Sequence, residues 1–217
     1  MQEIFPGLFK EGKKLYTLNL IPGNTQYAKT VLKKHGKEYR EWDPFHSKMA
    51  AAVEKGLKNF PVKKGSKILY LGIASGQTAS FFADIIGKDG IIYGVEVSER
   101  CIQDLNPVAS NRGNIVPILA NAKLPEQYSW IEKVDIVYQD VASDDQSEVM
   151  IRNCKEFLKS TGFAAMVIKA RSMNVVKDPQ EVYKQEIQKL EKHFKIVEKM
   201  QLDPYEKDHL FLLMEWK

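Results

Sequence analysis

The sequence has little cysteine, no long apolar run and no G-x-G-x-x-G motif, and each shortage excludes a class of protein. Its two cysteines, Cys101 and Cys154, lie in helix-like patterns without metal-ligand spacing, so buried reduced thiols are expected, with no disulfide framework and no bound metal. No apolar run approaches the length of a membrane span, and the N-terminus lacks the basic-then-apolar order of a signal peptide. We therefore expect a soluble, cytoplasmic protein without a membrane partner.

Charge is small overall but uneven along the chain. The formal net charge is +4, yet residues 29–67 contain 11 Lys or Arg against 4 Asp or Glu, a local excess of +7. A positive segment is typical of a protein that binds a polyanion such as RNA. A solvated lysine-rich surface, as found in proteins of heat-loving organisms, explains the same count equally well. The content of 44% hydrophobic and 28% charged residues excludes a disordered chain.

The stretch 67–80, KILYLGIASGQTAS, predicts a strand, a glycine turn and the start of a helix. Gly72 and Gly76 let the backbone turn sharply and approach a ligand beside the free N–H groups of the new helix. A second predicted strand, 91–95, leads to Glu96, 20 residues beyond Gly76, where a carboxylate can accept hydrogen bonds from both ribose hydroxyls of a nucleoside. An ordinary strand-to-helix turn would look similar on its own. The glycine spacing disfavours a dinucleotide and favours S-adenosylmethionine.

The order of predicted elements indicates an α/β protein with a small annex. Residues 1–42 hold short β-like segments, including 4–9 and 14–19, and predict a β-rich N-terminal annex. Asp43 and Pro44 predict a helix that begins there and runs to about residue 58. Strands and helices then alternate to the end of the chain, with strands at 68–71, 91–95, 115–119, 134–138, 163–169, 195–201 and 209–216, and helices at 80–87, 98–111, 144–158 and 179–193.

Such alternation predicts a mostly parallel sheet covered by helices on both faces. Only the turn 202–208 separates the last two strands, which is too short for a crossover helix, so these strands should pair antiparallel. One antiparallel last strand on an otherwise parallel sheet is typical of Rossmann-like S-adenosylmethionine-dependent methyltransferases. We assign residues 43–217 to such a methyltransferase domain.

Six segments together resemble the fibrillarin family of box C/D RNA-guided 2′-O-methyltransferases: EYREWDPFHSKMAAA, LYLGIASGQTAS, YGVEVSER, VDIVYQDVASDDQ, MVIKARS and LDPYEKDHLF. The resemblance covers almost the whole chain and is closer to the archaeal form, since the Gly/Arg-rich extension of eukaryotic fibrillarins is missing. It implies methylation of ribose 2′-hydroxyls in rRNA and tRNA. It also implies that a box C/D guide RNA selects the nucleotide, while a Nop5-type scaffold and an L7Ae-type RNA-binding protein hold the particle together.

The resemblance implies a cofactor site over the carboxyl ends of the strands. Gln77 and Thr78 would lie near the methionine end of the cofactor. Glu96 and Val97 would hold its ribose, and Asn121 and Ala122 would contact its adenine. The remaining residues of the predicted site come from the glycine turn and from the segment after the strand 134–138, namely Gly72, Ala74, Ser75, Gly76, Asp140, Val141, Ala142 and Ser143.

Three positions depart from the family, which commonly has Thr at Gln77, Asp at Asn121 and Gln at Ser143. The amide oxygen of Asn121 can still accept a hydrogen bond from the adenine amino group, so this contact should be weakened and not lost. The departures keep open a structural subunit of the same particle with little activity. A methyltransferase that acts on a protein side chain or a small molecule is a further alternative, and a nicotinamide dehydrogenase is disfavoured by the glycine spacing.

Four polar residues resemble the Lys-Asp-Lys-His catalytic tetrad of the family: Lys48, Asp140, Lys169 and His209. Two neighbouring lysines lower each other's pKa and burial adds to this, so one of them is expected to act as a base, a role we assign to Lys169. Lys48 and His209 are expected to position the ribose and its phosphate, and Asp140 to balance the lysines near the transferred methyl group. Each also has a purely structural interpretation when taken alone. Lys48 would be a solvated lysine, Asp140 and Lys169 would form an ion pair at the ends of two strands, and His209 would be a strand-edge residue.

The chain contains no recognisable RNA-binding module, which agrees with dependence on a guide RNA and protein partners. Trp42 and Phe45, close to Arg40, have the composition of a site that stacks on RNA bases. Aromatic residues beside a predicted helix are more often part of the core, and we favour that interpretation for both.

Overall fold

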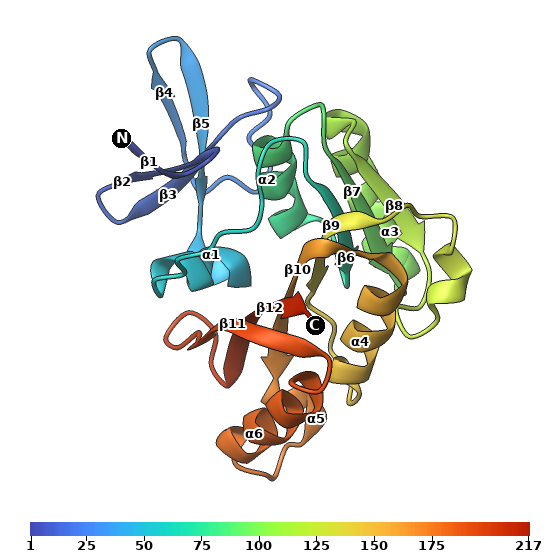
Figure 1. The fold of residues 1–217 in the computed structure, drawn as a ribbon. Coiled ribbons are helices and arrows are strands. Elements are labelled where there is room, and N and C mark those ends of the chain that lie inside the picture. Colours follow the sequence, from blue (N-terminus) through green and yellow to red (C-terminus); the bar gives the residue numbers. More distant parts are fainter.

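The structure is a computed structural model that describes all 217 residues and contains two β-sheets (Figure 1). The N-terminal sheet is antiparallel, with the strand order β1-β2-β3-β5-β4 and strands β1 (Gln2–Phe5), β2 (Leu8–Glu11), β3 (Lys14–Leu18), β4 (Val31–Lys34) and β5 (Lys37–Trp42). The β-like segment predicted at 4–9 belongs to two strands, because the chain reverses at Gly7, whose φ is +79°, and forms the β1–β2 hairpin. A left-handed residue at such a turn favours glycine.

The main sheet has seven strands in the order β11-β12-β10-β9-β6-β7-β8. All its neighbouring strands from β10 to β8 pair parallel, whereas β12 runs antiparallel to both β10 and β11. This confirms the predicted sheet with its antiparallel last strand. Its strands are β6 (Lys67–Leu71), β7 (Ile91–Glu96), β8 (Ile115–Leu119), β9 (Val134–Gln139), β10 (Leu158–Lys169), β11 (Phe194–Gln201) and β12 (His209–Trp216).

Helices cover both faces of the main sheet because its strands are apolar on both faces. In β6, Ile68 and Tyr70 belong to one buried cluster and Leu69 and Leu71 to the other, as the alternation of side chains along a strand requires. The first cluster packs against α1, α2 and α3, and the second against α4 and α6. The helices are α1 (Lys48–Glu54), α2 (Gln77–Ile86), α3 (Glu99–Arg112), α4 (Gln146–Phe157), α5 (Ala170–Met173) and α6 (Pro179–Leu190). None has the length and apolarity that a membrane crossing requires.

The helix expected from residue 43 to about residue 58 is divided. Asp43 does cap a helix, since its Oδ1 accepts from Phe45 N at 3.1 Å, but that helix is the short 3₁₀ turn η1 (Pro44–His46). Ser47 is extended and buried, and its hydroxyl oxygen accepts from Thr78 Oγ1 at 2.9 Å, so α1 begins only at Lys48. The chain leaves α1 after Glu54.

Two smaller expectations about buried residues also need correction. Trp42 is buried and stacks on Phe81 with ring centroids 5.2 Å apart, but Phe45 is 54% exposed and is not a core residue. Cys154 is buried, whereas Cys101 is only partly buried, and neither forms a disulfide. The ring of Phe45 packs edge-on against Tyr205, which belongs to a surface loop. This contact covers only part of the ring, so Phe45 stays at the surface.

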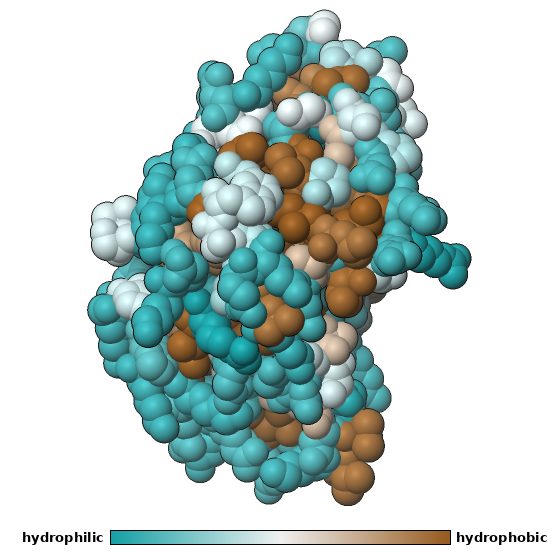
Figure 2. All heavy atoms as spheres, turned by 90° about the vertical axis from the view of Figure 1, so that its right-hand side faces the viewer, coloured by the Kyte–Doolittle hydropathy of each residue, from teal (hydrophilic) through white to brown (hydrophobic).

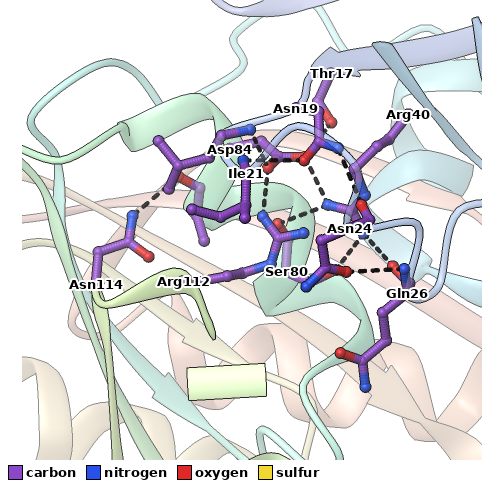
Figure 3. Close-up of polar contacts among 12 residues, drawn as sticks. Thr17, Asn19, Ile21, Asn24, Gln26, Arg40, Ser80, Asp84, Arg112 and Asn114 are labelled. Carbon is purple, nitrogen blue, oxygen red and sulfur yellow. Dashed lines mark hydrogen bonds and ion pairs between the residues drawn. The ribbon is translucent and has the colours of Figure 1, made fainter. Parts of the chain in front are cut away.

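A buried ionic cluster joins the N-terminal sheet to α2 and α3 (Figure 3). Asp84 of α2 forms ion pairs with Arg40 of β5, at 2.6 Å, and with Arg112 of α3. The three side chains are at most 1% exposed. Thr17 Oγ1 donates to the same carboxylate at 2.7 Å, and Arg40 also donates to the backbone oxygen of Ser80 at 3.1 Å. The N-terminal sheet is therefore fixed to the helix that follows the glycine turn.

Apolar side chains remain exposed beside β8, the edge strand of the main sheet. Leu119, Leu124 and Trp130 are 52%, 39% and 62% exposed. Figure 2, which views the side of the molecule that carries β8 and α3, shows apolar atoms grouped near the middle of this face. A patch of this kind is typical of a surface that contacts another macromolecule.

Candidate active site

A cavity of about 710 Å³ lies at the carboxyl ends of the parallel strands, where the predicted site was placed. Eleven predicted residues line it: Gly72, Ala74, Glu96, Val97, Asn121, Ala122, Asp140, Val141, Ala142, Ser143 and Lys169. The sequence did not indicate the other six lining residues, which are Val95, Ala120, Lys123, Asp144, Val149 and Ser172. Six predicted residues are outside the lining: Lys48, Ser75, Gly76, Gln77, Thr78 and His209.

Glycine is required at the two positions of the turn for different physical reasons. Gly72 has a φ of +75°, and a Cβ there would lie 3.1 Å from the carbonyl carbon and oxygen of Asp140. Gly76 has a φ of +85°, and its Cβ would lie 2.5 Å from Leu105 of α3. Gly72 thus lets the turn pass close to the end of β9 beside the cavity, whereas Gly76 serves the packing of the turn against α3. The surroundings of Gly76 therefore indicate close packing against α3, and they do not indicate a close approach to a ligand.

The second half of the turn contacts the N-terminal part of the chain. Ser75 O accepts from the Tyr27 hydroxyl at 2.8 Å, and Thr78 is buried with its hydroxyl on Ser47. Sequence reasoning missed Tyr27, because nothing in the sequence pairs position 27 with position 75. The roles of Gln77 and Thr78 at the methionine end stay predictions.

Glu96 is held at the end of β7 by backbone donors. Its Oε2 accepts from Ala74 N at 3.0 Å, and its Oε1 accepts from Val97 N at 2.9 Å and Ser98 N at 3.0 Å. A carboxylate has about four acceptor positions, so three are used and one on Oε2 remains. One ribose hydroxyl can therefore bind directly, while a second must replace one of the amide contacts.

The far side of the cavity offers one free acceptor position and one free hydroxyl. Asn121 Oδ1 accepts from Lys123 N at 3.0 Å, which leaves a single lone pair of that oxygen for a ligand. Ser143 Oγ is buried without a hydrogen-bond partner. A buried polar atom without a partner costs free energy, and a polar ligand that fills the cavity relieves this cost. The lining thus fits a nucleoside-type cofactor even at two of the positions that depart from the family.

Asp140 stands between the two lysines of the predicted tetrad. Its Oδ2 lies 3.1 Å from Lys48 Nζ and its Oδ1 lies 2.7 Å from Lys169 Nζ. Lys169 Nζ also donates to the backbone oxygen of Asp140 at 2.8 Å. His209 lies opposite Lys169 in the β10–β12 register, and its Nδ1 is 2.6 Å from Lys207 O. The carbonyl requires a proton on Nδ1, so the neutral imidazole presents Nε2 as an acceptor.

The charges around Lys48 correct one expectation. Burial lowers the pKa of Lys48, but the negative charges of Asp140 and Glu206 and the hydrogen bond to Asp140 outweigh it, so this pKa lies above its ordinary value. The expectation that the paired lysines lower each other's pKa is therefore wrong for Lys48, since Asp140 separates them. Glu206 Oε1 lies 3.6 Å from Lys48 Nζ, a contact that the sequence analysis missed although Glu206 is part of the LDPYEKDHLF segment.

The sheet with its reversed strand β12, and the cavity between the glycine turn and Glu96, define the class of Rossmann-like methyltransferase folds. The profile of the fibrillarin family matches residues 1–217, and the chain belongs to this family. It is 46% identical over 216 residues to the fibrillarin-like rRNA/tRNA 2′-O-methyltransferase of Thermococcus gammatolerans, covering 97% of this chain and 96% of the relative.

Solved structures of the family have the same fold. Aeropyrum pernix fibrillarin, in complex with natively bound S-adenosyl-L-methionine, is 46% identical with a TM-score of 0.86, covering 93% of this chain and 88% of that one. A chain of a fibrillarin/Nop5p complex is 36% identical with a TM-score of 0.90, and both chains are fully covered.

Proposed function

We propose that the protein is an S-adenosylmethionine-dependent RNA 2′-O-methyltransferase, the catalytic subunit of a box C/D guide-RNA particle that acts on rRNA and tRNA. The observation that carries the proposal is the Lys48–Asp140–Lys169 chain beside a cavity of nucleoside-cofactor size, in a chain of the fibrillarin family. The name of the Thermococcus relative and the cofactor in the Aeropyrum structure support the same activity. Transfer of a labelled methyl group to a guide-paired RNA tests it.

The geometry of Lys169 explains how a lysine can take the hydroxyl proton. The bound cofactor supplies an activated methyl group on a sulfonium, while the 2′-hydroxyl is a poor nucleophile until its proton is removed. Lys169 Nζ donates to the backbone oxygen of Asp140 at 2.8 Å and lies 2.7 Å from its Oδ1, which fixes this nitrogen at the edge of the cavity, where it would accept the proton of the 2′-hydroxyl. The proton moves to Lys169 Nζ as the 2′-oxygen bonds to the methyl carbon, and the pair of the broken C–S bond stays on sulfur.

The partners follow from the same proposal. A Nop5-type scaffold is supported by the fibrillarin/Nop5p structure and by the apolar surface beside β8. We infer a guide RNA because the sequence contains no recognisable RNA-binding module that could select a nucleotide, and an L7Ae-type protein would reach the enzyme through the particle. We propose that this assembly works in the cytoplasm.

Removing the Glu96 side chain is expected to weaken binding of S-adenosylmethionine. A Glu96→Ala change deletes the acceptor for the ribose and releases three backbone donors, with a cost on the order of 2 kcal/mol or more in affinity. Calorimetric titration measures it, and Glu99→Ala, which removes a carboxylate from the exposed start of α3, serves as the matched control. Equal affinity of the two variants would remove Glu96 from the site.

The basic segment 29–67 presents less free charge than its composition predicts. Ion pairs to carboxylates engage Lys29, Lys33, Lys34, Arg40, Lys48, Lys64 and Lys67. Of its 11 basic residues, four remain without such a pair: Lys37, Lys55, Lys58 and Lys63. The isolated protein should therefore bind RNA weakly, through few phosphates.

We expect this weak binding to be insensitive to sequence and moderately sensitive to salt. If about four lysines contact phosphates of a single strand, raising the salt from about 50 to about 200 mM lowers the affinity by at most about fiftyfold. Fluorescence anisotropy with two unrelated RNA sequences measures both quantities. Tight binding to only one of the two would require base readout and would contradict this prediction.

A further inference from the structure

Glu206 places a second carboxylate on the catalytic chain. It belongs to the loop between β11 and β12, and Tyr205 of this loop packs against Phe45 of η1 with ring centroids 4.9 Å apart. The loop is thereby held beside the start of α1, where Lys48 is the first residue. Glu206 Oε1 lies 3.6 Å from Lys48 Nζ, and the two side chains are only 28% and 17% exposed.

The four groups alternate in sign in the order Glu206, Lys48, Asp140, Lys169. Lys48 thus faces two carboxylates, whereas Lys169 has only Asp140, which it shares. Titratable groups near this chain also include His209 at the start of β12 and the buried phenols of Tyr70 and Tyr138, whose pKa values burial raises well above their ordinary range. None of these three carries a negative charge near neutral pH, so the two carboxylates determine the charge state of Lys48.

We propose that Glu206 is a positioning residue that keeps Lys48 protonated, so that Lys48 acts only as a cationic donor and Lys169 is the lysine that gives up its proton. The proposal rests on the proposed function and adds the reason for the different roles of the two lysines. A charged Lys48 occupies one oxygen of Asp140 permanently, which leaves Lys169 with half of a shared carboxylate.

The test is the pH dependence of single-turnover methylation in the assembled particle. Loss of the carboxylate in Glu206→Gln lowers the pH at which Lys48 loses its proton, so the decline of activity at high pH should begin about one pH unit earlier. Glu206→Asp keeps the charge and should retain most of the wild-type profile. Asp208→Asn is the matched control, because it removes the same charge from the same loop, where Asp208 pairs with Arg171 and not with Lys48.

Two results would overturn the proposal. The first is a pH profile of Glu206→Gln in which the decline of activity at high pH begins where it does in the wild type. A lower overall rate with an unchanged decline would indicate that Glu206 has only a structural role. The other comes from NMR titration of the Lys48 side chain in the isolated protein, assigned with a Lys48→Arg variant. Its midpoint should fall in Glu206→Gln and stay in place in Asp208→Asn. This titration does not require activity, so it separates a failure of this inference from a failure of the proposed function.

Discussion

Lys169→Ala is expected to bind S-adenosylmethionine and to assemble normally, yet to lose methyl transfer by about a hundredfold or more. That loss is typical of a missing acid–base group. The side chain is 15% exposed and is held by two oxygens of Asp140, so its removal deletes the proton acceptor without opening the core. Single-turnover methylation of a guide-paired RNA measures the effect, and Lys155→Ala on the exposed side of α4 is the control for removal of a lysine.

Lys169→Arg separates a base from a mere positive charge. Arginine keeps the charge and can pair with Asp140, but it does not deprotonate in the working pH range, so it should not restore the rate. Near-normal rates with arginine would mean that the residue supplies only charge, and the assignment of Lys169 as the base would be wrong.

Asp84→Ala is expected to destabilise the fold by about 3 kcal/mol or more. The change leaves the guanidinium groups of Arg40 and Arg112 buried without their shared carboxylate, and an uncompensated buried charge is among the costliest defects of a core. Denaturation by guanidinium chloride, followed by circular dichroism, measures the free energy of unfolding. Asp89→Ala is the matched control, since Asp89 pairs with Lys64 at the surface, where such pairs contribute about 1 kcal/mol or less.

If Asp84→Ala and Asp89→Ala lower the free energy of unfolding equally, the buried cluster does not hold the N-terminal sheet to α2. A double change of Arg40 and Asp84 to apolar residues extends the test. It should recover part of the loss, because it removes one of the two isolated guanidinium groups, while that of Arg112 stays buried without its carboxylate.

The sheet was predictable because its strands are short apolar runs separated by helical patterns. The antiparallel pairing of β11 and β12 followed from the length of the turn between them. The helix boundaries were less predictable: Ser47 looks compatible with a continuous helix, and only its contact with Thr78, 31 positions away, explains why it is extended. The four-residue helix α5 leaves no pattern long enough to be recognised.

The site was predictable where chemistry follows directly from the ends of strands, as for Glu96 and Asp140. It was not predictable where charged residues from distant segments meet. Arg40 looks like a surface residue in the sequence, yet it is fully buried because Asp84, 44 positions later, neutralises it. Lys48 and Asp140 are 92 positions apart, and no periodicity relates either of them to Glu206. The family resemblance indicated the tetrad, but the structure was needed to find the second carboxylate.

The most direct test of the account is transfer of a radiolabelled methyl group from S-adenosylmethionine to an RNA paired with a box C/D guide, with and without the Nop5-type scaffold. The account predicts label on the ribose 2′-oxygen of one guide-selected nucleotide, dependent on the scaffold and lost in Lys169→Ala. Label on a protein side chain would show a different methyltransferase. A particle that assembles and binds the cofactor but transfers no label to RNA would contradict the account and identify this chain as a structural subunit.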